Sequence, residues 1–296
     1  FAASPLKLIL WHSIFIIFTC FIVGYGVVKG IGRSVSFLMP IFFIFIILIA
    51  IYSSLIGDID STLFFLFNPN FSALTPQVII SAMGQAFFSL SIGMGAIMAY
   101  GAYIPENQLI GKTVISIILL DTFVALIAGI AIFPIVFSNS DLTINAGPSL
   151  IFETLPVAFY SLPFGNIFSV LFFVLLSIAA LSSSISLLEP FTAWMEEKFK
   201  TERRIIVSIL GLLIWFIGLG SIFSFNVGQE IKFFGLNFLE GLDYLTNNIM
   251  LPIGGFFIAL LTGWILPKHF LQENLSINGY LFKLFFFCLR YISIGA

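Results

Sequence analysis

Apolar residues along the chain form long runs that are separated by short polar or charged stretches. Each run approaches the roughly 20 residues that an α-helix needs to cross a bilayer, and the sequence lacks the short alternating segments of a membrane β-barrel. The pattern predicts an all-α polytopic membrane protein, a single transmembrane domain over residues 1–296 with about seven complete helices and a truncated eighth that starts near Leu281. The complete spans are expected at about residues 8–24, 37–56, 81–104, 113–138, 166–188, 203–223 and 246–266.

The third of these spans interrupts its own apolar run at its centre. Residues 88–95 read Phe-Ser-Leu-Ser-Ile-Gly-Met-Gly, with two hydroxyls and two glycines where a plain membrane helix would carry Leu or Val. Unwound backbone inside a membrane is tolerated only where protein or water satisfies its polar groups, and secondary transporters use such broken helices to build binding sites. The alternative is an ordinary span whose small residues allow close helix packing. This segment alone leaves both interpretations open.

Composition and charge exclude a water-soluble protein and orient the chain. Only 9% of the residues are charged, against about a quarter in soluble proteins. Lys and Arg favour one set of alternate loops, which is therefore cytoplasmic. That side has Lys29, Arg33, Lys112, Lys198, Lys200, Arg203, Arg204, Lys268 and Lys283, and the other has Lys7 and Lys232. We expect a multi-pass protein of the plasma (bacterial inner) membrane with residue 1 outside. An extracellular start without a signal peptide predicts additional upstream helices.

The long connection between the fourth and fifth spans contains no Lys or Arg. Within it, Ser149–Leu155 is predicted to form a short amphipathic helix that ends at Pro156.

Asp121 lies about two turns inside the fourth span. A carboxylate at that depth is costly and suggests a functional site by default. The alternatives are a side chain that reaches the interface from near the helix end, or one that a neighbouring helix satisfies. A bound cation would be the simplest neutraliser, because hard cations such as sodium take oxygen ligands.

A second polar group lies in the fifth span, where three consecutive serines follow two alanines and a leucine. Ala179, Ser182 and Ser183 share one helix face at i, i+3 and i+4, and Leu187 continues that face. Two hydroxyls and a nearby carbonyl would suit a monovalent cation. A small-residue packing face, with serines bonded to the preceding turn, is the more common arrangement in membrane helices.

The sequence indicates no catalytic site. His12 and His269 lie at span edges, so neither a metal cluster nor a Ser-His-Asp set can be assembled, and no Gly-rich phosphate loop suggests an ATP-driven pump. Nothing indicates nucleic-acid binding. We therefore expect a protein that is not an enzyme.

Four segments together resemble the neurotransmitter:sodium symporter family, in particular its prokaryotic amino-acid transporters with the LeuT fold. They are residues 84–95, 121–134 (DTFVALIAGIAIFP), 147–156 (GPSLIFETLP) and 179–190 (AALSSSISLLEP). The order and spacing of the segments agree over essentially the whole chain. By this resemblance the spans correspond to the family's fourth to tenth helices and the start of the eleventh. It implies a fragment without the first three helices and the C-terminal end.

The resemblance also implies roles for individual residues. Two sodium sites are expected, one with Ser89 and Asp121 as ligands, and one with the Ala179 carbonyl, Ser182 and Ser183. The implied substrate pocket contains Phe88, Ser89, Ser91, Met94, Ser183 and Leu187. The implied extracellular gate residues are Gln85 and Asp243, and the intracellular ones are Tyr103 and Glu197.

Departures from the family pattern at three positions shape the expected chemistry. The family often has Asn where Asp121 stands, and its chloride-dependent members have Ser where Ala125 stands. We therefore expect that the Asp121 charge makes chloride unnecessary. Met94 occupies a position that is often Phe, and Met adapts in shape. We therefore expect a hydrophobic or aromatic amino acid as substrate.

The resemblance predicts a symporter that couples amino-acid import to sodium by alternating access, with the amino acid and membrane lipid as partners. The family's first helix would supply about half of each binding site. The chain alone is therefore expected neither to bind nor to transport. A cation channel that uses Asp121 as its titrating group and a non-transporting regulatory relative are the alternatives.

Overall fold

The computed structural model describes residues 4–105, 110–138, 150–160, 162–224, 226–228, 230–275 and 279–293, except the side chains of Val28, Glu153 and Ile292. Every regular element in these ranges is a helix, apart from an isolated bridge between Phe233 and Leu236. Among the described residues, six helices are long and apolar enough to cross a membrane, which confirms the predicted all-α membrane class. They span Pro5–Gly24, Lys29–Ile56, Ile110–Phe137, Gly165–Phe199, Arg203–Phe223 and Phe238–Ile265.

The chain divides into two compact units. Unit 1 comprises Phe1–Gly32, Thr75–Ser116 and Ser184–Ala296, and unit 2 comprises Arg33–Leu74 and Ile117–Ser183. Helices α6 and α8 each contribute to both units. The single transmembrane domain stays a prediction. The α-helices are α1 Pro5–Gly24, α2 Arg33–Ile56, α3 Ile59–Phe67, α4 Pro76–Ser89, α5 Ala96–Gly101, α6 Ile110–Phe137, α7 Leu155–Tyr160, α8 Gly165–Phe199, α9 Arg203–Phe223, α10 Phe238–Tyr244, α11 Leu251–Leu260, α12 Lys268–Leu275 and α13 Gly279–Phe287.

The remaining helical turns are short and mostly wider than an α-helix. The segment η2 (Phe71–Ala73) is a 3₁₀ turn. The π-helical turns are η1 Val27–Gly32, η3 Leu150–Thr154, η4 Leu245–Met250, η5 Leu261–Ile265 and η6 Cys288–Ile292. Two of them, η4 and η5, flank α11 within one continuous helical run. Such turns often accompany functional sites, and η4 contributes to the cavity described below.

The core of unit 2 is formed by side chains of α2, α6, α7 and α8, including Ile49, Ile135 and Phe159. The Tyr52 ring stacks on Phe168 at 3.5 Å between centroids. Its hydroxyl donates a hydrogen bond of 2.6 Å to the Pro163 carbonyl oxygen. Tyr52 thus buries an apolar ring while its polar end is satisfied, and it ties α2 to the segment that begins α8.

Helix α3, which the apolar pattern did not predict, begins at an acidic cap. Asp58 accepts hydrogen bonds from the Ser61 backbone N–H at 3.0 Å and the Ser61 hydroxyl at 2.6 Å. The Asp58 N–H donates to the Pro134 carbonyl oxygen of α6 at 2.9 Å. Side-chain bonds to the free N–H groups of a first turn stabilise a helix start. The cap therefore fixes where α3 leaves α2.

This cap should weaken in acid. The hydroxyl and N–H of Ser61 lower the pKa of the Asp58 carboxyl below its ordinary value. The stabilisation is therefore complete above the unfolded-state pKa of about 3.9, and it is lost as the pH falls through the lower folded-state pKa. Hydrogen exchange of the α3 amides, corrected for intrinsic rates, should show protection falling below about pH 4. An Asp58→Asn variant should lack this dependence; the same acid loss in the variant would exclude Asp58 as its origin.

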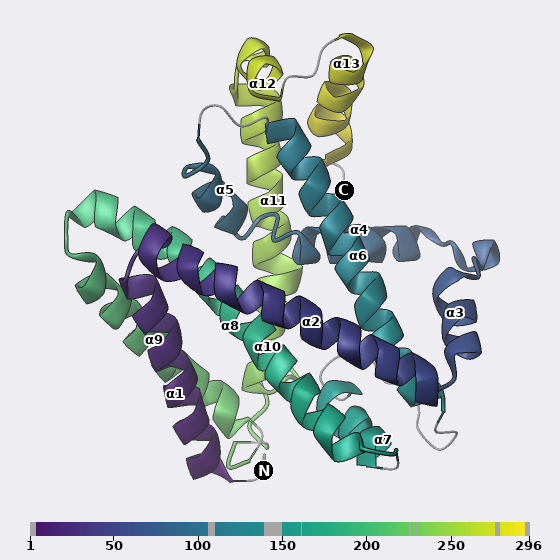
Figure 1. Cartoon of the computed structure of the whole chain (residues 1–296). Helices are drawn as coiled ribbons and strands as arrows, with labels where there is room; N and C mark the ends of the chain where they lie inside the picture. Colours follow the sequence, from purple (N-terminus) through teal and green to yellow (C-terminus); the bar gives the residue numbers. More distant parts are fainter. Residues whose placement is uncertain are drawn as a thin grey trace. The chain divides into compact units, whose positions relative to one another are not determined.

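In unit 1, α1 and α9 lie side by side (Figure 1). The Trp215 indole N–H donates to the Ser13 hydroxyl oxygen at 2.9 Å, and a His12 ring nitrogen lies 3.3 Å from the Trp215 carbonyl oxygen. A methyl group at Gly218 would clash with the His12 ring. Small residues that let helices approach and hydrogen bonds that cross between them are typical of membrane packing. This interface joins residues about 200 positions apart in the sequence.

Two predicted boundaries differ from the structure. The short helix expected to end at Pro156 instead continues through η3 and α7 to Tyr160, while its expected start at Ser149 lies outside the described residues. Pro156 occupies the first turn of α7, where a helix does not need the missing N–H. The seventh span begins at Phe238, earlier than predicted, because Asn237 and Glu240 form a capping box.

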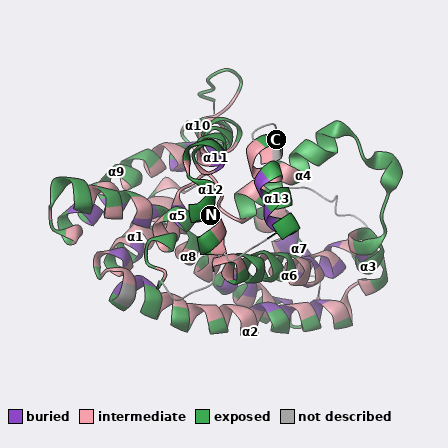
Figure 2. Cartoon of the chain, turned by 90° about the horizontal axis from the view of Figure 1, so that it is seen from above, coloured by how far each residue is buried: buried purple, intermediate pink, exposed green. Residues whose placement is uncertain are grey.

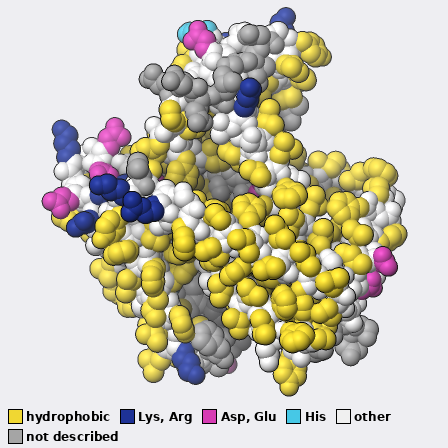
Figure 3. All heavy atoms as spheres, in the orientation of Figure 1, with side chains coloured by type: hydrophobic (Ala, Val, Ile, Leu, Met, Phe, Trp, Pro, Cys, Tyr) yellow, Lys and Arg dark blue, Asp and Glu magenta, His cyan; other side chains and the backbone are white. Residues whose placement is uncertain are grey.

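The surface is that of a membrane protein. Large apolar side chains stand exposed along the long helices, among them Ile17, Phe37 and Leu55. Exposed residues recur along each of the long helices (Figure 2). Hydrophobic side chains cover most of the visible face, and Lys and Arg gather around the turn between α8 and α9 (Figure 3). A soluble monomer rarely exposes so much contiguous apolar surface. In a bilayer the same surface contacts lipid tails, which are as apolar as the side chains themselves.

Candidate functional site

The broken helix is confirmed in unit 1. Helix α4 ends at Ser89, the chain is unwound over residues 90–95, and α5 begins at Ala96. Ser91, Gly93 and Gly95 have φ values of +53°, +95° and +79°, in the region that glycine occupies without strain. The two glycines therefore make the unwound conformation accessible, and Ser91 adopts it as a non-glycine residue.

The end of α4 follows a known helix-terminating arrangement. The Ile92 N–H donates to the Phe87 carbonyl oxygen at 2.9 Å, and the Ser91 N–H donates to that of Phe88 at 3.0 Å. This pair of bonds around a left-handed residue is a Schellman motif, with Ser91 where glycine is usual. It satisfies two carbonyl groups that the end of α4 would otherwise leave free. The break is thus a stable feature of the backbone.

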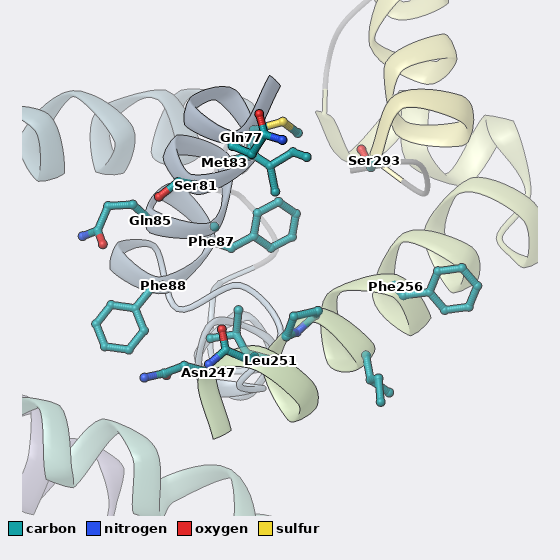
Figure 4. Close-up of a pocket in the computed structure, with 15 residues that line it drawn as sticks. Gln77, Ser81, Met83, Gln85, Phe87, Phe88, Asn247, Leu251, Phe256 and Ser293 are labelled. Carbon is teal, nitrogen blue, oxygen red and sulfur yellow. The ribbon is translucent and has the colours of Figure 1, made fainter. Parts of the chain in front are cut away.

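A cavity of about 910 Å³ lies in unit 1 between α4 and the run from η4 into α11. Gln85 and Phe88, predicted as gate and substrate residues, line it together with Asn247 (Figure 4). The Asn247 amide donates to the Asp243 carboxylate at 2.7 Å. The structure thus brings the two predicted extracellular gate residues to one region, Gln85 on the cavity wall and Asp243 bonded to a lining side chain.

A buried ion pair lies near the other end of the broken helix. Glu189 on α8 is fully buried and forms a salt bridge with Arg203, the first residue of α9. Arg203 also bonds the Glu196 carboxylate at 3.2 Å and the Val23 carbonyl oxygen at 2.8 Å. The Tyr103 hydroxyl donates to Glu189 at 3.4 Å. Arg203 therefore joins the segment after α5 to α1, α8 and α9 through one cluster.

Neither Glu189 nor Arg203 was predicted as a site residue. Glu189 carried a usable signal, because it is a carboxylate at the end of an apolar run. Tyr103, one of the predicted intracellular gate residues, contacts this carboxylate. Glu197, the other one, is exposed on α8, and its role stays a prediction.

The predicted sodium ligands divide between the two units. In unit 2 the Ser182 hydroxyl donates to the Ala179 carbonyl oxygen at 2.8 Å, so two ligands of the expected second site lie together. Ser183, the third, is exposed, and Asp121 is half-buried on α6. Ser89 ends α4 in unit 1 and Asp121 belongs to unit 2. The pairing of Ser89 with Asp121, like that of Ser183 with Leu187 of unit 1, stays a prediction.

Comparison with known proteins gives consistent matches. Residues 4–294 match the Sodium:neurotransmitter symporter family. The chain is 34% identical over 289 residues to the uncharacterized sodium-dependent transporter YhdH of Bacillus subtilis (strain 168), covering 98% of this chain and 64% of the relative. It is 33% identical over 279 residues to an uncharacterized sodium-dependent transporter of Haemophilus influenzae, covering 94% of this chain and 60% of the relative. The chain thus spans less than two thirds of the length of these relatives.

A solved structure matches over nearly the whole chain. The crystal structure of MhsT in complex with L-phenylalanine superposes with a TM-score of 0.89 at 40% sequence identity. The match covers 99% of this chain and 67% of the MhsT chain. The predicted LeuT-like fold is confirmed by this likeness.

Proposed function

Because the chain belongs to the sodium:neurotransmitter symporter family, we propose that it acts as a sodium-coupled symporter that imports a hydrophobic or aromatic amino acid by alternating access. The observation that carries the proposal is the unwound segment after α4, whose backbone groups leave the α-helical hydrogen-bond pattern within an apolar span. Backbone groups of that kind bind substrates and ions in transporters with broken helices. The likeness to MhsT, whose structure contains L-phenylalanine, supports this class of substrate.

In this proposal two sodium ions are cargo of the transport cycle. Ser89 and Asp121 bind the first ion, and the Ala179 carbonyl, Ser182 and Ser183 bind the second. The Ser182 hydroxyl lies 2.8 Å from the Ala179 carbonyl oxygen, which places two hard oxygen ligands on one face of α8. This bond to the preceding turn is also what the packing alternative predicts. The fixed charge of Asp121, together with Ala125 in place of a hydroxyl, makes chloride unnecessary.

The substrate lies against the unwound segment. Ser91 and Met94 contact it from that segment, Phe88 covers it, and Ser183 and Leu187 face it from α8. Met94 adapts its shape to apolar side chains, which favours a hydrophobic or aromatic amino acid. Gln85 and Asp243 act as gate residues on the extracellular side, and Tyr103 and Glu197 on the cytoplasmic side of the plasma membrane, with residue 1 outside.

Competition among the twenty amino acids tests this function. In proteoliposomes that contain the full-length protein, an imposed sodium gradient should drive uptake of L-phenylalanine, and hydrophobic and aromatic amino acids should compete best. Preference for a charged amino acid would refute the substrate assignment. Sodium current without any amino acid would instead indicate a channel. Binding without transport would indicate a regulatory relative.

A further inference from the structure

The unwound segment rests on α11 through backbone atoms. Gly93, in the left-handed part of that segment, faces Gly254 and Gly255 in the middle of α11. All three glycines belong to unit 1. Phe87 of α4 and Leu251 of α11 line the same cavity beside this contact (Figure 4).

None of the three glycines has room for a side chain. A methyl group at Gly254 would clash with the Gly93 carbonyl oxygen and lie 3.3 Å from its Cα atom. One at Gly93 would lie 2.7 Å from the Leu251 carbonyl oxygen and 3.0 Å from the Gly255 nitrogen. Carbon atoms in comfortable contact are about 3.5–4.0 Å apart. The two backbones therefore touch directly, with no side chain between them.

The third contact is of a different kind. A methyl group at Gly255 would lie 2.9 Å from Cε1 of the Phe87 ring and 3.3 Å from Cδ1. This neighbour is a side chain, which can rotate or be shortened by substitution, whereas the carbonyl group of Gly93 can move only if the unwound segment moves. The two positions on α11 should therefore respond differently to the same added methyl group.

Helix α11 also connects this contact to the gate region. The run from α10 through η4 to α11 carries Asp243, and about three turns later it carries Gly254 and Gly255. Asn247, which bonds the Asp243 carboxylate, lies between them on the same run. A displacement of the unwound segment therefore acts on the same helical run that carries a predicted gate residue.

We propose that Gly254 and Gly255 are positioning residues for substrate binding. They hold the segment of residues 90–95 at the place where Ser91 and Met94 can contact the substrate, although neither glycine touches it. The inference rests on the proposed function, because it assigns the unwound segment to the substrate. A simple packing role for the two glycines is the competing explanation.

Three alanine variants of the full-length protein test the inference. Gly254→Ala and Gly255→Ala change the contact, and Gly241→Ala on α10 is the matched control, because no atom lies within 4 Å of the added methyl group. Sodium-dependent binding of L-phenylalanine should weaken about tenfold or more in Gly254→Ala, because the methyl group displaces the Gly93 carbonyl group and binding groups must be held within about 0.5 Å of their productive positions. Gly255→Ala should lose less, and Gly241→Ala should bind as the wild type does.

Rescue and selectivity separate positioning from simple packing. Phe87→Leu should restore binding in Gly255→Ala, because it removes the ring that the methyl group meets. The affinity ratio between L-phenylalanine and L-valine should change in Gly254→Ala, since a displaced segment reshapes the pocket. A variant that is only less stable has fewer folded molecules with an unchanged ratio.

The outcomes remain distinct if one variant fails to fold. Wild-type affinity and selectivity in folded Gly254→Ala and Gly255→Ala would overturn the inference. If Gly254→Ala does not fold, Gly255→Ala decides: weakened binding that Phe87→Leu restores supports the inference, and unchanged binding overturns it. Absence of sodium-dependent amino-acid binding in the wild type would refute the proposed function itself, which is a separate result.

Discussion

Replacing Asp121 with asparagine in the full-length protein is expected to weaken sodium activation of uptake by about tenfold to a hundredfold. Two unit charges about 4 Å apart attract by about 4 kcal/mol at an effective dielectric constant of 20, and each 1.4 kcal/mol corresponds to a factor of ten in affinity. Asparagine keeps an oxygen ligand and so retains part of this attraction. The measurement is the sodium concentration for half-maximal uptake of L-phenylalanine.

Thr122→Ala is the matched control for Asp121. Thr122 is the next residue on α6, and its hydroxyl donates to the Ile118 carbonyl oxygen of its own helix at 2.9 Å. This substitution should leave sodium activation unchanged. Replacement of chloride by gluconate should also leave wild-type uptake unchanged. Equal sodium activation in Asp121→Asn and the wild type would remove Asp121 from the sodium site, and chloride-stimulated wild-type uptake would contradict its role as the fixed charge.

Replacing Arg203 with alanine is expected to destabilise the fold by about 3–5 kcal/mol, the usual cost of removing one partner of a buried ion pair. Glu189 is fully buried, and the side chain of Arg203 is only 13% exposed. Without the guanidinium, Glu189 retains the Tyr103 hydroxyl as a partner but has no salt-bridge partner among the residues that the structure describes. The effect is measured by thermal unfolding in detergent, monitored as the loss of monodisperse protein with rising temperature.

The neighbouring arginine provides the control for this prediction. Arg204 is exposed, and its guanidinium lies 5.6 Å from the centre of the Tyr25 ring, so Arg204→Ala should have a small effect. The double variant Arg203→Ala with Glu189→Gln should be more stable than Arg203→Ala alone, because no buried charge remains unpaired. Equal thermal stability of Arg203→Ala and Arg204→Ala would show that the buried pair does not stabilise the fold.

Several local features of the fold were predictable from single segments. The break over residues 90–95 was visible because glycine and serine interrupt an apolar run, and the structure has left-handed residues there. Helix α8 covers the predicted fifth span at residues 166–188 and continues through Pro190 to Phe199. The capping signals were present but overlooked, namely Asp58 before α3 and Asn237 with Glu240 before α10. These signals lie in polar loops, and a prediction based on apolar runs gives no information about such loops.

The candidate site was predictable to a smaller extent. Asp121 and the serine cluster stood out because polar groups are costly inside a membrane span. Glu189 satisfies the same criterion, yet its partner Arg203 belongs to the next helix. The contact between Gly93 and Gly254 involves two glycines about 160 positions apart. A glycine in a sequence does not indicate which distant backbone segment packs against it.

By itself, the sequence determined the membrane class, the approximate spans, the position of the helix break and the family. Each of these follows from local hydropathy, from glycine and serine at defined positions, or from motifs within one segment. Only the tertiary structure decided that α11 supports the unwound segment, that Arg203 neutralises Glu189, and that α1 packs on α9. These contacts depend on shape and distance between residues far apart in the chain. Hydropathy carries no information about them, because in lipid an apolar helix can pack on many neighbours with similar energy.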